Sequence, residues 1–466
     1  MSNGILPDYL SMAKPNPFTN RAPWYKNTAP TYAGIFLWFV FWSTMASGGG
    51  APYAGGVLSE GIGVALLGLV IASLLCHFLF YLAPGLFGMK TGLPLYVVGS
   101  STYGTTGGLL MPGFLMGLLQ FGWLAVNAYY SSQALSPLWN GNPSVTKVVM
   151  VIWALGAAFI ALKGIQYVAK VSTYLPLIPV VILLILLFKT IGGIGEFDSV
   201  ALIEKAPEDA GPSLGFMGVI ALSISYVVGF YATAGAAGVD FGSNSKNEKD
   251  VQMGGLMGVA LAAIVTGGLS LLIAAGAFAK TGTYDLNTAG SALMGSVVSA
   301  GAAKWMGVLL AISAFPSACF SSFIAANSFK TTLPKVNPFI SVGIGAVVAA
   351  IIAVAGWAGD LASVFSVIGA SFGPVCGAMA VEYLISGKKW SGPRKGWNLA
   401  GWISWVAGFV VGIAPLVGIA NIPAAPLFAF IVGAVLFFIL AKAGLQPPVI
   451  EMATASTGKA EENASA

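Results

Sequence analysis

Charged side chains are scarce in this sequence. Lys, Arg, Asp and Glu make up 8% of its 466 residues, whereas hydrophobic types make up 57%. Because soluble domains carry about 25% charged residues, this composition excludes a large globular protein and predicts a polytopic membrane protein. Acidic residues in the apolar stretches are confined to Asp240, Asp360 and Glu382, each near the end of its stretch. We therefore expect a neutral ligand, since a charged one would need an opposite charge inside the membrane.

Cysteine and histidine are also rare. The three cysteines, Cys76, Cys319 and Cys376, lie in apolar stretches and form no CxxC pair, which argues against a disulfide framework or a zinc site. The single histidine, His77, has no second histidine with which to form an HExxH motif. A membrane enzyme is therefore disfavoured, and we expect no catalytic residue and no cofactor.

The sequence does contain a series of apolar stretches of roughly 20 to 30 residues, each long enough to cross about 30 Å of hydrocarbon. They predict an all-α protein with about twelve transmembrane helices. The predicted helices cover residues 32–58, 61–87, 106–136, 145–163, 169–191, 212–241, 251–279, 300–327, 335–356, 359–385, 396–419 and 422–443. Residues 1–30 predict a mostly unstructured segment without the apolar centre of a cleaved signal peptide. Residues 444–466 predict a disordered tail.

The basic residues predict the orientation. With both termini in the cytoplasm, sixteen of the 21 Lys and Arg residues fall on the inner side. This is the excess that the positive-inside rule describes. We therefore expect a multi-pass protein of the inner cell membrane whose N- and C-terminal segments, 1–30 and 444–466, are cytoplasmic.

Two glycine-rich stretches interrupt the predicted helices. Ser43 to Gly56 contains three consecutive glycines and a proline, which disfavour a helix because glycine costs about 1 kcal/mol and proline about 3 kcal/mol relative to alanine. A second stretch, Gly229 to Gly242, lies in the sixth helix. The first and sixth helices cross in opposite directions, which is typical of an inverted five-plus-five repeat with broken helices at a transporter's midplane. The alternative is that glycine only permits close helix packing.

This repeat defines the predicted domain organisation. A single transmembrane domain covers residues 31–443. Its first repeat covers 31–191, its second covers 212–385, and two additional helices lie within 396–443.

Polar side chains gather on one face of the third predicted helix. Gln120, Trp123 and Asn127 fall at positions i, i+3 and i+7, which places two amides and an indole on the same face. An amide that both donates and accepts, beside a flat aromatic ring, suits a planar heterocycle. The alternative is that Gln120 and Asn127 only tie this helix to a neighbour.

The interruptions supply further candidates for the substrate site. Phe230, Tyr231 and Thr233 lie in the sixth helix, where rings and a hydroxyl can face one cavity. Gly49 lies in the first interruption. Irregular backbone at membrane depth is tolerated where it is buried in protein or lines a cavity.

Candidate cation ligands are neutral oxygens. They are the carbonyls from Ser43 to Ala46 in the first interruption, and the hydroxyls of Ser313 and Ser317 beside Pro316 in the eighth helix. Unwound carbonyls of this kind coordinate coupling ions in secondary transporters. If a metal ion is bound at these positions, we expect sodium.

Several short motifs carry a family resemblance. They are GMKTGL at Gly88–Leu93, QFGW at Gln120–Trp123, VGFYATAG at Val228–Gly235 followed by VDF at Val239–Phe241, and EYL at Glu382–Leu384. With these motifs the chain resembles the purine/cytosine permease family, also called nucleobase:cation symporter family 1, and within it the cytosine permease branch. The hydropathy pattern agrees over about residues 30–443.

The resemblance implies a leucine-transporter-type fold that works by alternating access. It implies that Gln120 binds the edge of the base, that Trp123 and Tyr231 form the two faces of an aromatic sandwich, and that Thr233 lies near the substrate. The eighth helix departs from the family pattern, because Ala314 stands where the family has an asparagine. Ala318 likewise replaces one of two hydroxyls and leaves Ser317 alone. The departure puts cytosine itself, and coupling to sodium rather than to protons, in doubt.

These features predict a secondary active transporter that imports a neutral nucleobase or a related small heterocycle by symport with Na⁺ or H⁺. One alternative is a transporter of the same fold for another neutral solute, such as a hydantoin, allantoin or a thiamin-precursor pyrimidine. Another is a passive channel or facilitator. We expect a monomer in the lipid membrane, with a small-molecule substrate and no nucleic-acid polymer as partner.

Overall fold

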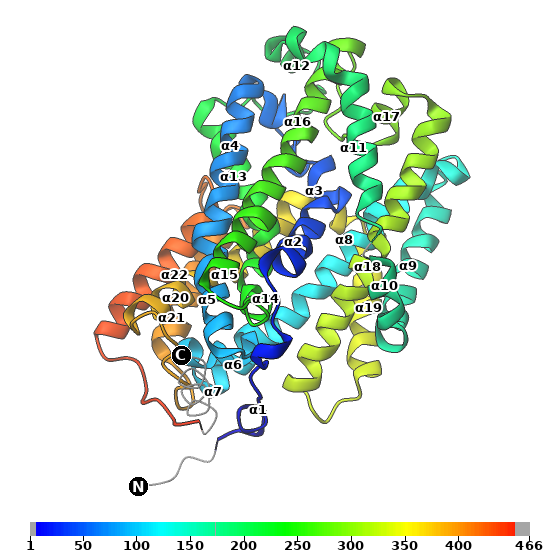
Figure 1. Ribbon diagram of the computed structural model, residues 1–466. Helices are drawn as coiled ribbons and strands as arrows, with labels where there is room; N and C mark the ends of the chain where they lie inside the picture. Colours follow the sequence, from blue (N-terminus) through cyan, green and yellow to red (C-terminus); the bar gives the residue numbers. More distant parts are fainter. Residues whose placement is uncertain (1–5, 173, 453–466) are drawn as a thin grey trace.

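The computed structural model describes residues 6–172 and 174–452 (Figure 1). Within this part of the chain the regular structure is helical, and β-type pairing is limited to isolated bridges. Nine of the described helices are long and apolar enough to cross a membrane, and two shorter apolar helices cover Pro338–Val354 and Leu399–Ile413. Of the tail 444–466, which the sequence predicts to be disordered, residues 444–452 are ordered by pairing with the loop after α20 (Leu361–Ile385), as in the bridge between Arg394 and Val449. Residues 453–466 lie outside the described ranges.

Each predicted transmembrane helix has a counterpart, and several counterparts consist of two segments. The first six are α2 (Thr28–Leu37) with α3 (Phe39–Ser43), α4 (Gly61–Leu75) with α5 (Leu82–Thr91), α7 (Ser100–Gly108) with α8 (Met116–Leu135), α9 (Pro143–Lys163), α11 (Leu177–Thr190), and α13 (Phe216–Ala236) with α14 (Gly238–Gly242). The last six are α15 (Glu248–Gly255) with α16 (Ala262–Thr281), α18 (Ala300–Thr332), α19 (Pro338–Val354), α20 (Leu361–Ile385), α21 (Leu399–Ile413) and α22 (Ala425–Lys442).

Short helices and wide helical turns complete the chain. Turns of π-helix over residues 76–81, 109–115 and 256–261 join the segments of the second, third and seventh transmembrane helices. Such turns occur often at functional sites. The short helices are α1 (Asp8–Ser11), α6 (Leu95–Val98), α10 (Ile165–Ser172), α12 (Ser199–Glu204) and α17 (Ser291–Val297).

The first transmembrane helix is interrupted earlier than the sequence predicts. α2 ends at Leu37, Trp38 adopts an extended conformation (φ −60°, ψ 122°), and α3 ends at Ser43. The glycine-rich stretch is therefore not a break inside this helix, and that part of the prediction is wrong. It forms turns beyond the helix end, in which Gly48, Gly49 and Gly50 have φ of 63°, 82° and 83°. Successive positive φ values suit glycine and end the helix.

The sixth transmembrane helix is interrupted inside the predicted stretch, Gly229 to Gly242, in its second half. α13 continues without a break to Ala236, and the interruption lies at Ala237, before α14. The glycines predicted to break the helix instead allow close contacts. A Cβ on Gly229 would lie 2.7 Å from the carbonyl oxygen of Phe365, and one on Gly235 would lie 2.9 Å from Cβ of Phe80. At Gly229 and Gly235 the structure supports the alternative interpretation, that glycine permits close helix packing.

The transmembrane helices form two groups that lie side by side (Figure 1). In one group, α8, α9, α18 and α19 pack against one another, and in the other α13 packs against α4, α20 and α22. α5 crosses α14 at very short distance within the second group, because a Cβ on Gly88 would lie 1.9 Å from the carbonyl oxygen of Val239. The helix interruptions at Trp38 and Ala237 both belong to this second group.

The two ends of the described chain lie at the same end of the molecule. Tyr9 donates a hydrogen bond from Oη to the carbonyl of Thr105 at 2.5 Å. The backbone N–H of Thr105 donates to the carbonyl of Arg394 at 2.7 Å, and that of Lys395 donates to the carbonyl of Pro448 at 3.1 Å. An even number of crossings brings both ends to one side of a membrane.

The segment before α2 is packed against this end, although the sequence predicts that it is mostly unstructured. Leu10 is fully buried. Asn16 donates from Nδ2 to the carbonyl of Ser243 at 3.1 Å, and Arg21 donates from Nη1 to the carbonyl of Met89 at 2.6 Å. We call residues 16–24 the N-terminal strap. Its polar side chains find backbone acceptors at the ends of the second and sixth transmembrane helices, which explains an order that its composition does not predict.

Candidate functional site

Trp123 lies where the two groups of helices meet. It belongs to α8, and its buried indole ring contacts aromatic rings from three other transmembrane helices. The ring centroids of Trp38, Phe230 and Phe365 lie 5.8, 5.4 and 5.8 Å from that of Trp123. Its Nε1–H donates to Oγ1 of Thr233 at 3.2 Å. We call these five residues the aromatic cluster.

Gln120 lies one turn before Trp123 on the same face of α8 and is 7% exposed. Its amide nitrogen contacts Sδ of Met116 at 3.5 Å. A thioether is a weak acceptor, and Gln120 makes no other hydrogen bond within the described chain. Its amide therefore keeps most of its donor and acceptor capacity for a ligand.

Asn127 has a different environment, although it shares the face. It is 1% exposed. Its Nδ2 donates to the carbonyl of Ala314 at 2.9 Å, and its Oδ1 accepts from Nε1 of Trp153 at 2.9 Å and from Oγ of Ser131 at 3.2 Å. These bonds tie α8 to α9 and α18. The structure thus supports the interpretation of Asn127 as a tie between helices.

Phe230 and Tyr231 both lie near Phe36, but only Phe230 contacts Trp123. Phe230 faces Trp123, as described above, whereas the ring of Tyr231 stacks on Phe36 at 5.7 Å with an interplanar angle of 17° and lies 5.7 Å from Tyr32. The structure therefore does not bring Tyr231 to Trp123 as the second face of a sandwich. Consecutive residues on a helix diverge by about 100°, so only one of the two rings can face α8.

Gly49 and Ala314 lie at the margins of the cluster. The carbonyl of Gly49 accepts from the backbone N–H of Ala362 at 3.2 Å, which joins the turns after α3 to the start of α20. A Cβ on Gly49 would lie 3.2 Å from the ring of Tyr226. Ala314 is 1% exposed, and the contact given above to Asn127 uses its carbonyl.

Three of the four predicted cation ligands take part in hydrogen bonds. The carbonyl of Ser43 accepts from the backbone N–H of Thr288 at 2.9 Å, and that of Ala46 accepts from Val57 at 2.8 Å. Ser313, on α18, donates from Oγ to the carbonyl of Leu310 in its own helix.

Ser43 and its surroundings nevertheless form a buried group of oxygens. Oγ of Ser43 has no hydrogen-bond partner in the described chain. Ser270 donates from Oγ to the carbonyl of Trp42, and its Oγ lies 2.9 Å from Oγ1 of Thr288. Ser317, the remaining predicted ligand, is half-buried on α18.

Sequence reasoning missed two residues that contact Trp123, Trp38 and Phe365. It also missed two near Ser43, Ser270 and Thr288. Trp38 stands in a run of aromatic and aliphatic residues in which no glycine or proline marks an interruption. Phe365 reaches Trp123 from α20, where no polar motif marks its position in the sequence. A single hydroxyl in an apolar helix usually bonds to its own backbone, so Ser270 gave no signal. Thr288 lies in the loop between α16 and α17, outside the predicted helices.

Ionisable groups do not take part in the aromatic cluster. The described part of the chain contains no group of three or more His, Cys, Asp and Glu residues that could hold a metal ion. Two buried carboxylates, Asp250 and Glu382, lie near the helix ends and bond to Trp24 and to Arg394, respectively. The cluster thus offers stacking surfaces and one hydroxyl, and Gln120 beside it offers an amide, which together suit an uncharged planar ligand.

Comparisons with known proteins identify the fold that contains this site. No family profile and no curated protein matches the sequence. In structure, the chain is similar to Mhp1, a nucleobase-cation-symport-1 family transporter, in a closed conformation with bromovinylhydantoin bound, at 14% identity and a TM-score of 0.67 over 96% of this chain and 98% of that one. It is also similar to an inward-facing conformation of Mhp1, at 17% identity and a TM-score of 0.68 over 96% of each chain. The chain therefore has the fold of Mhp1, and the predicted all-α, leucine-transporter-type fold class is confirmed.

Proposed function

We propose that this chain is a secondary active transporter of the nucleobase:cation symporter type, which imports a neutral nucleobase or a related small heterocycle. The observation that carries the proposal is the aromatic cluster beside Gln120 at the contact between the two groups of helices. In a fold shared with a transporter, this is where a small planar ligand would be enclosed by both groups.

The residues suggest how the ligand would be held. The indole of Trp123 provides a flat face, and Phe230 and Phe365 border it. Gln120 supplies a donor and an acceptor to the ring edge, and Thr233 supplies a hydroxyl once its bond to Trp123 opens. Because the rings pack directly against one another here, the ligand must separate Trp123 from Phe230. That separation moves one group of helices relative to the other, which is the motion that alternating access requires.

The hydantoin alternative has a specific observation in its favour. The similar Mhp1 structure contains bromovinylhydantoin, and a hydantoin ring is small, planar and uncharged, with neighbouring donors and acceptors. The same cluster would accept it. Allantoin and thiamin-precursor pyrimidines follow from the same chemistry without an observation of their own.

A thermal-shift screen of the purified protein identifies the ligand class. The panel is cytosine, uracil, adenine, guanine, hypoxanthine, two hydantoins and allantoin, each in sodium and in potassium buffer. A ligand that binds the native state raises the melting temperature by mass action. A hit that requires sodium supports sodium symport, whereas a sodium-independent hit supports proton symport. If none of these neutral heterocycles raises the melting temperature in either buffer, the proposal fails.

Proteoliposome uptake of the hit tests coupling. We expect accumulation above the external concentration that collapses when an ionophore dissipates the ion gradient. Equilibration without accumulation would instead support the passive channel or facilitator.

For the remaining properties we propose a monomer in the inner membrane. We propose cytoplasmic termini because the basic residues are concentrated on that side.

A further inference from the structure

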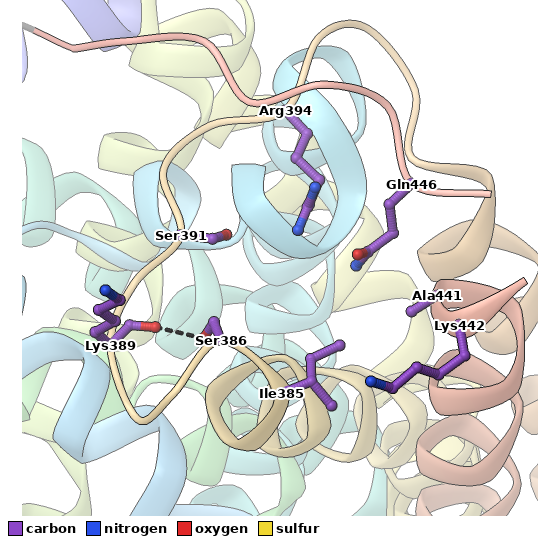
Figure 2. Close-up of a pocket in the computed structure, with 8 residues that line it drawn as sticks. All are labelled: Ile385, Ser386, Lys389, Ser391, Arg394, Ala441, Lys442 and Gln446. Atoms are coloured by element: carbon purple, nitrogen blue, oxygen red, sulfur yellow. Dashed lines mark hydrogen bonds between the residues drawn. The ribbon is translucent and has the colours of Figure 1, made fainter. Parts of the chain in front are cut away.

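A second polar site lies far from the aromatic cluster, at the end of the molecule that carries the termini. A cavity of about 410 Å³ opens there between the end of α20, the loop that follows it and the end of α22 (Figure 2). Its lining includes three cationic residues, Lys389, Arg394 and Lys442. Ligand pockets in proteins typically measure about 300 to 1,000 Å³, so the cavity has room for a polar headgroup.

One of the three cations is already neutralised. Arg394 donates from Nη2 to Oε1 of Glu382 at 3.4 Å, and the side chain of Glu382 is fully buried. The same carboxylate accepts from Oγ of Ser391 at 2.6 Å and from Nε2 of Gln446 at 3.0 Å. Arg394 also donates to the carbonyl of Pro447 at 3.1 Å. This buried network holds the wall of the cavity in place. The charges of Arg394 and Glu382 cancel, so the network adds no net charge to the cavity.

The other two cations are uncompensated. Lys389 and Lys442 make no ion pair with a carboxylate in the described ranges, 6–172 and 174–452. In Figure 2, Lys442 extends from α22 toward the cavity, whereas Lys389 lies beyond Ser386 with its ammonium group turned away from Lys442. Lysines at helix ends also complement the helix dipole. That role alone needs no cavity. An ammonium group directed at a polar hollow, with a second exposed lysine on the rim that can turn toward it, favours an anion contacted by both.

The surroundings of the cavity are those of a membrane surface. Nζ of Lys442 lies 5.9 Å from the ring centroid of Phe438, which is 45% exposed. Leu384, at the end of α20, is 61% exposed, and Trp397, in the loop after it, is 48% exposed. Exposed apolar side chains below the cavity and tryptophan beside it are typical of the interface between hydrocarbon and headgroups. A ligand here would have an anionic head in the cavity and an apolar part along the helices.

We propose that this cavity binds the phosphate group of an anionic phospholipid headgroup, with Lys389 and Lys442 as its cationic contacts. Basic pockets at the cytoplasmic ends of transmembrane helices can recognise such headgroups. A soluble phosphate compound has the same chemistry but lacks acyl chains that could follow the exposed surfaces of Leu384 and Phe438. The inference goes beyond the proposed transport function and does not depend on it.

Binding of short-chain lipids to the purified full-length protein in detergent tests the site. The probes are dihexanoyl-phosphatidylglycerol, zwitterionic dihexanoyl-phosphatidylcholine and glycerol 3-phosphate, with melting temperature and tryptophan fluorescence as readouts. The test variant is Lys389→Gln/Lys442→Gln. The matched control, Lys388→Gln/Lys395→Gln, removes the same charge from two exposed lysines at the same end that do not line the cavity.

We expect phosphatidylglycerol to stabilise the protein more than phosphatidylcholine does. Its dissociation constant should rise about 10- to 30-fold in Lys389→Gln/Lys442→Gln, since each basic contact near a membrane surface contributes about fivefold. The control should stay within about twofold. Equal weakening in both variants, or no preference for phosphatidylglycerol, would overturn the site. If glycerol 3-phosphate binds as tightly with the same dependence on the variants, the phosphate site stands and the lipid as its occupant is excluded.

Discussion

At the scale of single residues, Trp123 is the side chain on which the proposed ligand site depends. Trp123→Ala should weaken binding of a planar ligand by about 1 to 3 kcal/mol, the range for stacking of a base on an aromatic side chain. Trp123→Phe retains a ring but cannot donate to Thr233, and it should lose less. Titration of the screened ligand against the three purified proteins measures the difference. Equal affinity in the wild type and Trp123→Ala would remove Trp123 from the site.

Gln120 and Asn127 are amides on the same face of α8, and their substitutions should have different effects: one on ligand affinity, the other on stability. Gln120→Leu should reduce ligand affinity at unchanged melting temperature, because its amide has only a weak partner in Met116. Asn127→Leu should lower the stability of the fold by about 1 to 2 kcal/mol, because it leaves the carbonyl of Ala314 and Nε1 of Trp153 without their partner. Melting temperatures with and without ligand give both quantities. A loss of stability in Gln120→Leu as large as in Asn127→Leu would indicate that Gln120, too, is structural.

Spacing along α8 was sufficient to predict that Gln120, Trp123 and Asn127 share a face, because the repeat of a single helix determines which side chains lie on the same side. It could not predict which amide is free, since that depends on Trp153 and Ala314 in other helices. The pairing of Tyr231 with Trp123 came from the family resemblance and not from geometry. The rotation of α13 turns Phe230 toward α8 instead.

At the scale of helices, the crossing of α5 over α14 allows a sharp prediction. Gly88→Ala should strongly reduce the yield of folded protein, because its Cβ would lie 1.9 Å from the carbonyl oxygen of Val239, a backbone atom that cannot rotate away. Gly122→Ala is the matched control, since a Cβ there meets no atom within 4 Å. Size-exclusion profiles of the two variants in detergent compare them. A monodisperse, fully stable Gly88→Ala would show that the two helices can separate at low cost.

The number and approximate bounds of the transmembrane helices could be predicted because the membrane requires long apolar stretches. The interruptions could be located only in part: that of the sixth helix lies within the predicted stretch, whereas that of the first helix lies before it. Glycine lowers helix propensity, but in α13 the glycines are compensated by contacts with Phe365 and Phe80 that only the fold supplies. Trp38, conversely, has no sequence feature of a helix breaker. Its extended conformation is a result of tertiary structure.

At the scale of the whole molecule, the three cysteines report on the integrity of the fold. Cys76, Cys319 and Cys376 are free and buried, and they belong to the second, eighth and tenth transmembrane helices. A polar maleimide should therefore label the native protein at less than about one-tenth of the rate seen after denaturation in dodecyl sulfate, because buried thiols react slowly. Mass spectrometry of the labelled protein gives the rates. Rapid labelling of native Cys319 would show that α18 is open to water in the resting state.

The N-terminal strap has a consequence for the order of events during synthesis. Asn16 and its acceptor Ser243 are separated by 227 residues, and Trp24 and its acceptor Asp250 by 226. At about 5 to 20 residues per second, a ribosome needs roughly 10 to 45 s to produce the second partner after the first. During that interval the strap emerges with none of these partners yet made. Its docking at Ser243 and Asp250 is therefore a late step of biogenesis, which follows insertion of the sixth transmembrane helix.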